Sequence, residues 1–150
     1  LVKVWRPVCN TGSPTDPYQP DWSSVGRYSW EIPRGIPKAG ESSSVTALRE
    51  GGAETGRRIV RAQLLGEYSW NSTFAVHNIP LYTAEVAGTG KAPKGDPNEK
   101  ILQVDWLTAG QVDELVDAGE IFCGFTLAAL YHLGRKGIFP SAQVVGASPV

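Results

Sequence analysis

Two glutamates near the middle of the chain, Glu50 and Glu54, have the type and spacing that metal-assisted chemistry requires. They lie four positions apart, and a helix places residues at that spacing on one face, with about 5 to 6 Å between their Cβ atoms. The like charges repel each other there, but a shared cation removes the repulsion, because Mg²⁺ binds one or two carboxylates together with phosphate oxygens of a substrate. The pair therefore indicates Mg²⁺-dependent chemistry on a diphosphate. Glutamate pairs also occur on ordinary solvated helices, so the pair by itself leaves that interpretation open.

The residues around the pair favour the metal site over a solvated helix face. They follow the spacing G-x5-E-x7-R-E-x3-E-x-G, and the matching positions are Gly35, Glu41, Arg49, Glu50, Glu54 and Gly56. This pattern resembles the box motif of the Nudix family. Ala53 stands where the family pattern has the first glutamate of a pair, so the box is degenerate at one position. The segment 31–35, which leads into the box, is similar to that of ADP-ribose pyrophosphatases in the family.

The resemblance implies an activity, a cofactor and a set of roles. The activity is hydrolysis of the diphosphate of a nucleoside diphosphate linked to another group, as in ADP-ribose or a nucleotide sugar, with Mg²⁺ or Mn²⁺ as the cofactor. Glu50 and Glu54 would be catalytic metal ligands, and Arg34 would add its backbone carbonyl to the metal site. Arg49 would help to brace the loop before the helix. The structural positions of the box would be Gly35, Glu41 and Gly56.

The expected substrate contacts lie close to the box. Arg34 and Arg49 are the candidate substrate-binding cations, and Trp30 could stack a nucleobase, a contact worth roughly 1 to 3 kcal/mol in nucleic-acid sites. Trp30 could equally be a buried core residue, whereas Trp70 is expected in the core. Glu99 is the candidate catalytic base, because family hydrolases often take an acidic residue from this region of the chain. A solvated residue in a Gly/Pro-rich loop is the alternative for Glu99.

Ala53 leaves two functional interpretations open. The missing carboxylate has three explanations: an introduced inactivating change, a natural drift toward binding without turnover, or a site completed by Asp96 or Glu99. In the first interpretation the chain is a pyrophosphohydrolase with impaired activity. In the second it is a non-catalytic Nudix-fold module that binds a nucleotide or regulates a partner.

Composition and charge narrow the choice of partner. The chain has 150 residues, of which 41% are apolar and 19% charged, as expected for one globular domain. A net charge of -1 provides no basic surface for nucleic acid, and no apolar run has the roughly 18 residues of a membrane span. We therefore expect a small nucleoside diphosphate derivative as the partner, in a cytoplasmic protein without a targeting peptide. The resemblance allows a homodimer, and no feature of the sequence requires one.

The order of apolar runs and turn signals predicts an α/β fold, with a mixed β-sheet sandwiched between α-helices. Residues 1–138 would form a single Nudix domain that lacks N-terminal strands, and residues 139–150 a C-terminal tail. Strands are expected at 1–6, 28–32, 59–70, 73–86 and 102–107. Helices are expected after a serine cap within 42–44, after the cap at Thr108 and over 126–133. The polar segments 14–24 and 88–99 are expected to be loops.

Overall fold

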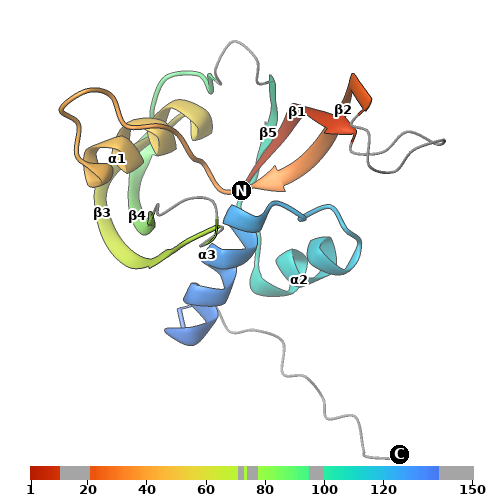
Figure 1. Ribbon diagram of the computed structural model, residues 1–150. Helices are drawn as coiled ribbons and strands as arrows, with labels where there is room; N and C mark the ends of the chain where they lie inside the picture. Colours follow the sequence, from red (N-terminus) through yellow and green to blue (C-terminus); the bar gives the residue numbers. More distant parts are fainter. Residues whose placement is uncertain (11–20, 71–72, 74–77, 95–99, 139–150) are drawn as a thin grey trace, which may run out of the picture.

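The computed structural model describes residues 1–10, 21–70, 73, 78–94 and 100–138. Its strands are β1 (Val2–Asn10), β2 (Asp21–Glu31), β3 (Arg57–Tyr68), β4 (Ile79–Thr89) and β5 (Lys100–Val104). Its helices are α1 (Ser43–Thr55), α2 (Ala109–Asp117) and α3 (Gly124–Arg135). Figure 1 shows α1 beside β3 and β4 at the left, with β1, β2 and β5 at the upper right and α2 and α3 below them.

The described strands form two separate sheets. One has the order β2-β1-β5, and the other consists of β3 and β4. All of these pairings are antiparallel. The combination of helices and strands agrees with the expected α/β class, but these strands do not form the single mixed sheet that we expected. The reason is that β1 pairs with the next strand in the chain, as β3 does, and β5 also runs antiparallel to β1.

The strand β2 is longer than the sequence pattern predicted. It begins at Asp21, inside the expected loop 14–24, and pairs with β1 over a register that includes Val8 opposite Val25. Both strands therefore extend beyond the expected segments 1–6 and 28–32. Pairing with a neighbouring strand outweighs the weak strand propensity of the polar residues at this end of β2.

The strand β5 occupies an earlier segment than the expected 102–107. It starts at Lys100, opposite Trp5, and ends at Val104, opposite Val2. Because β1 itself begins at Val2, the pairing ends there. The limits of β5 are therefore set by its partner strand.

The helix α1 begins after one of the predicted serine caps and has a closely packed centre. Ser42 is the N-cap residue, and its hydroxyl accepts a hydrogen bond from the backbone N–H of Val45 at 3.4 Å. Gly56 ends the helix in the left-handed conformation, with φ 64°. A Cβ added at Gly52 would lie 3.3 Å from the Arg57 carbonyl oxygen. Close packing thus accounts for this mid-helix glycine, which costs about 1 kcal/mol of helix propensity relative to alanine.

The two later helices differ in how well the sequence predicted their ends. At α2 the expected capping box is present, since the backbone N–H of Thr108 donates to the Gln111 side chain and the Gln111 N–H donates to the Thr108 hydroxyl. The helix α3 begins at Gly124, two residues before the expected start. It also continues past Gly134, where we expected it to end, and the left-handed residue after it is Gly137, with φ 64°.

The core consists of two clusters that meet at α3. The first contains Trp30, Val112 and Ile121, and the second contains Leu65, Leu81 and Ala129. Within α3, Leu130 packs against the first cluster and Ala129 belongs to the second. The helix α3 therefore joins the sheet that holds Trp30 to the sheet formed by β3 and β4. No helix within the described ranges is long and apolar enough to cross a membrane.

Candidate functional site

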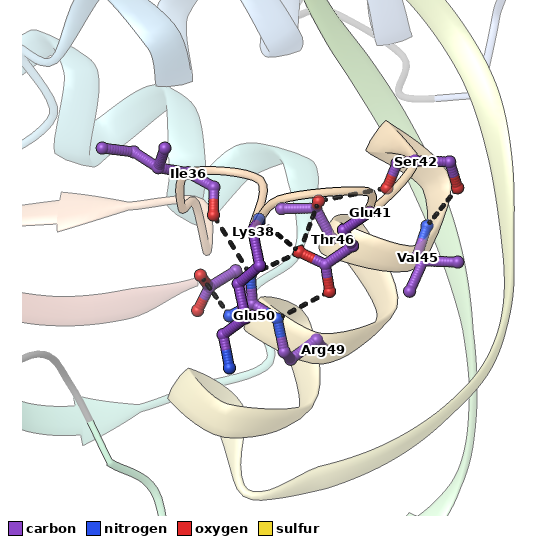
Figure 2. Close-up of polar contacts among 8 residues, drawn as sticks. All are labelled: Ile36, Lys38, Glu41, Ser42, Val45, Thr46, Arg49 and Glu50. Atoms are coloured by element: carbon purple, nitrogen blue, oxygen red, sulfur yellow. Dashed lines mark hydrogen bonds and ion pairs between the residues drawn. The ribbon is translucent and has the colours of Figure 1, made fainter.

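The loop that enters α1 is fastened to the helix by Glu41 and Arg49, as Figure 2 shows. Arg49 donates from Nε to Oε1 of Glu41 and from Nη2 to Oε2, both at 2.8 Å, which is the strong bidentate geometry of arginine with a carboxylate. The Lys38 backbone N–H and the Thr46 hydroxyl each donate to Oε2 at 3.0 Å. Nη2 of Arg49 also donates to the Ile36 carbonyl at 3.1 Å. These contacts tie the loop to the middle of the helix.

The same contacts favour the charged form of both partners. Donation from the Arg49 side chain, followed by donation from the Lys38 backbone, lowers the pKa of Glu41 from 4.5 to about 2. Hydrogen bonding to Glu41, and then to Glu50, raises the pKa of Arg49. Glu41 and Arg49 therefore keep opposite charges at neutral pH.

Replacing Glu41 by glutamine is expected to destabilise the fold at neutral pH and to have less effect in acid. The pKa of Glu41 is lower in the folded chain than in the unfolded chain. Its contribution to stability is therefore complete above pH 4.5 and is lost as the pH falls toward about 2. Denaturant unfolding of wild type and E41Q, measured over this pH range and at neutral pH, checks the prediction.

The matched control for this experiment is E85Q. Glu85 pairs with Arg61 at 3.2 Å, but both side chains are more than 60% exposed, and such surface pairs contribute little to stability. We expect its unfolding free energy to follow wild type at every pH. A difference between wild type and E41Q that stays constant across the acid range would show that Glu41 does not act through its charge.

Glu50 lies between the Arg49 guanidinium and the start of the loop. Nη1 of Arg49 contacts Oε1 of Glu50 at 2.6 Å, so the carboxylate already has a cationic partner. On its other side, a Cβ added at Gly35 would overlap the Glu50 carboxylate. The absence of a side chain at position 35 is therefore what allows Glu50 to lie against the loop backbone.

The face of α1 that carries Glu50 and Glu54 is buried, although the residues on it are polar. Thr46 is 6% exposed and Glu54 is 3% exposed, and with Glu50 between them they follow four-residue steps along one face. Val45, an apolar residue of the same helix, is by contrast 49% exposed. Polar groups at the start of α1 account for the burial of Thr46, because its hydroxyl donates to Glu41 and to the Ser42 carbonyl.

Ala53, the degenerate position, lies beside a segment from a different part of the chain. Its carbonyl accepts a hydrogen bond from the backbone N–H of Lys94 at 2.8 Å, and Gly90 donates to the Gly56 carbonyl at 2.8 Å. A Cβ added at Gly56 would lie 2.8 Å from the Lys91 carbonyl oxygen. Residues 90–94 thus pack on the C-terminal end of α1, next to the position where the family has a carboxylate.

The residues of α1 provide part of a Mg²⁺ site. Glu50 and Glu54 supply two carboxylates one turn apart, and Mg²⁺ in proteins uses one or two carboxylates with waters and substrate phosphates. The backbone at Gly35 lies close to one of them, because no Cβ intervenes. Among the described residues, no three acidic, histidine or cysteine side chains lie close enough together to hold a metal ion. The donor set therefore fits Mg²⁺ only if oxygens from substrate or water complete it.

Trp30 lies in the core, which was one of its two expected positions, whereas Trp70 does not lie in the core as expected. Trp30 is 6% exposed and packs against Val112 and Ile121, so it takes the core position that was the alternative to nucleobase stacking. A ring with so little exposed surface offers no face to a nucleobase in this structure. Trp70, expected in the core, is 59% exposed, because it follows the end of β3 at Tyr68.

Arg34, expected to contact substrate, directs its side chain toward α3. Its Nε donates to Oε2 of Glu31 at 3.1 Å, and its guanidinium carbon lies 4.9 Å from the centre of the Phe125 ring. The Arg34 side chain is 33% exposed, whereas that of Glu31 is 4% exposed. The guanidinium thus already has an anionic partner and an aromatic partner within the fold.

Two candidate site residues from the sequence, Asp96 and Glu99, lie outside the described residues. Two residues of the site, Thr46 and Phe125, were not found by sequence reasoning. For Thr46 a signal existed, since it lies four positions before Glu50 on the same helix. For Phe125 none existed, because its contact with Arg34 joins positions 91 residues apart, a separation given by 125 minus 34.

Comparison with known proteins identifies the family of the chain. No curated protein matches the chain. The family model of the NUDIX domain matches residues 17–122, a range that includes the loop, α1 and the segment packed on its end. Because this match covers more than half of the 150 residues, the chain belongs to the Nudix family.

Proposed function

We propose that this chain is a Mg²⁺-dependent hydrolase of a nucleoside diphosphate derivative, of the ADP-ribose or nucleotide-sugar type, with activity reduced by Ala53. The observation that supports this most directly is the position of Glu50 and Glu54 on one face of α1, where Glu50 is held by Arg49 and Arg49 is held in turn by Glu41. Membership of the Nudix family supports the reaction class, which is pyrophosphohydrolysis. Mn²⁺ is the alternative cofactor.

Each residue of the site would have a distinct task. Bound Mg²⁺ would neutralise the charge of the diphosphate and polarise its oxygens. Glu50 and Glu54 would hold the cation, together with the backbone carbonyl of Arg34. Arg49 would hold the Glu50 carboxylate in place through their 2.6 Å contact and would offer its guanidinium to a substrate phosphate. Glu41 would hold Arg49 in position through its bidentate pair.

A non-catalytic nucleotide-binding module is the second candidate function. Two observations favour it: the missing carboxylate at Ala53, and the ion pair that Glu50 already makes with Arg49. In such a module the Glu41–Arg49 pair and the fold would be retained for nucleotide binding, whereas a complete metal site would not be required.

A substrate panel separates the two functions. The chain is incubated with ADP-ribose, several nucleotide sugars and a dinucleoside diphosphate, each with Mg²⁺, with Mn²⁺ and with a chelator, and release of the monophosphate is measured. Metal-dependent release from at least one compound supports the hydrolase. Tight calorimetric binding of a compound without release under any condition would instead support the binding module.

Glu99→Gln is expected to lower the turnover number by about 10²- to 10⁴-fold, the usual contribution of a general base, and to leave substrate affinity nearly unchanged. Glu99 follows Lys94 by five positions, and Lys94 is bonded to Ala53 at the end of α1. The chain between them therefore spans at most about 17 Å. Steady-state kinetics of E99Q, with E85Q as the control at an exposed carboxylate of β4, test the role. Equal rates in wild type and E99Q would return Glu99 to the class of solvated loop residues.

The finer features of the architecture are also proposals. We propose that residues 1–138 form one cytoplasmic domain, followed by a tail, in which the sheets lie between α1 on one side and α2 with α3 on the other. Limited proteolysis tests the domain boundary, since cleavage within 1–138 at native conditions would contradict it.

A homodimer is the oligomeric state that the family resemblance allows. Light scattering tests it, and a monomer mass at about 100 µM would exclude the homodimer as a stable species.

A further inference from the structure

We propose that α3 positions the first residue of the box through Arg34, so that Arg34 is a positioning residue whose side chain holds the loop rather than the substrate. This inference rests on the proposed function for its effect on catalysis, but its structural part can be tested alone. It concerns residues 31–35, the segment between β2 and the box glycine, and the N-terminal turn of α3. We call this set of contacts the α3 clamp; its members are Glu31, Arg34, Tyr68 and Phe125.

Backbone contacts first bring the segment to α3. The N–H of Trp30 donates to the Glu120 carbonyl at 2.9 Å, just before α3 begins. The N–H of Ile32 donates to the hydroxyl of Thr126 at 3.1 Å, and Thr126 is fully buried. These two bonds fix the chain on either side of Glu31, and Arg34 is only two residues beyond Ile32.

The side chains of the clamp then hold Arg34 from two directions. The Glu31 carboxylate, which is almost completely buried, accepts from Nε of Arg34 at 3.1 Å. The Phe125 ring lies under the guanidinium at 4.9 Å, a cation–π distance. Tyr68 of β3 meets the edge of Phe125, with ring centres 6.0 Å apart and planes at 84°. The arginine is thus held by a partner from β2 and by a ring from α3 that β3 supports.

The position of Arg34 determines what its neighbour can do. Gly35 is the next residue, and the Glu50 carboxylate lies directly against its backbone, where a Cβ would overlap it. A shift of Arg34 would therefore move both the Arg34 carbonyl and the surface on which Glu50 rests. A substrate could recruit the Arg34 guanidinium only by breaking its contacts with the buried Glu31 carboxylate and with the Phe125 ring. The contacts therefore favour a positioning role.

The test uses two variants in the clamp and two matched controls. F125L keeps an apolar side chain but removes the π face, and R34K keeps the charge but loses the planar group. Y131L changes another aromatic residue of α3, one that is 65% exposed, and R61K changes an exposed arginine of β3 in an ion pair. Amide hydrogen exchange of the peptide covering residues 32–41 is measured in the metal-free chain, followed by Mn²⁺ titration and steady-state kinetics.

We expect exchange in residues 32–41 to become about 3- to 10-fold faster in F125L and in R34K, the range that loss of a cation–π contact produces in an equilibrium constant. The double variant should show little further change, because both substitutions remove the same contact. Y131L and R61K should match wild type. Mn²⁺ affinity should fall with the faster exchange, and the turnover number should fall more than KM rises.

Two results would overturn the clamp. One is unchanged exchange in both F125L and R34K, and the other is an R34K variant with a raised KM but normal exchange, which would make Arg34 a substrate contact. If wild type hydrolyses no diphosphate, the proposed function fails, but hydrogen exchange in F125L and R34K still tests whether the α3 clamp holds residues 32–41. If F125L does not fold, hydrogen exchange in R34K alone provides this test.

Discussion

Ala53→Glu is expected to increase the rate of diphosphate hydrolysis by about 10- to 10³-fold. The estimate follows from the roughly 10²- to 10³-fold that is lost when one preorganised electrostatic group is removed from an active site. Position 53 lies three residues after Glu50 on α1, so a new carboxylate would be a neighbour of Glu50 on the helix surface. We place the lower limit at 10-fold because residues 90–94 pack on this end of the helix and restrict the new side chain.

The matched control is Ala53→Gln, which adds the same shape without the charge. Its rate should stay within about twofold of the wild-type rate, whereas Mn²⁺ should bind more tightly to Ala53→Glu than to either. Kinetics on the substrate panel and calorimetric Mn²⁺ titration provide both measurements. If Ala53→Glu folds, binds Mn²⁺ more tightly and still hydrolyses nothing, the hydrolase proposal fails and the binding module remains.

Glu54→Gln is expected to remove most of the remaining activity, by about 10²- to 10³-fold. Glu54 is 3% exposed, and glutamine preserves its shape while it removes the negative charge. Mn²⁺ affinity should fall at least about 10-fold, since changing even an outer partner of a metal ligand costs about 10- to 100-fold. Mn²⁺ titration with single-turnover kinetics measures both effects.

Glu114→Gln is the matched control for this substitution, because it removes an exposed carboxylate from α2. Its Mn²⁺ affinity and rate should equal those of wild type, and thermal unfolding should show that both variants are folded. Unchanged Mn²⁺ affinity in Glu54→Gln would move the metal site away from α1 and contradict the proposed ligands.

Local residue chemistry was sufficient to predict several elements. The serine cap at Ser42 and the capping box at Thr108 appear as expected, since each depends on residues only a few positions apart. The box spacing likewise identified the family that the NUDIX domain match shows. These features could be predicted because their physical causes are contained within a short stretch of chain.

Pairing and burial could not be predicted in the same way. The extension of β2 back to Asp21 depends on β1, and the end of β5 depends on where β1 begins. The exposure of Val45 and the burial of Thr46 follow from the polar loop that lies against α1. In each case the deciding contact comes from another segment, so the local pattern contained too little information.

The sequence by itself determined the chemical identity of the site: two glutamates one helical turn apart, a missing carboxylate at Ala53, and a glycine that begins the box. Only the tertiary structure decided which neighbours these residues have. It placed Trp30 in the core, turned Arg34 onto Phe125 and brought Lys94 to Ala53. The physical reason is that burial and long-range contacts depend on how distant segments pack together, whereas helix spacing and capping depend on the local backbone.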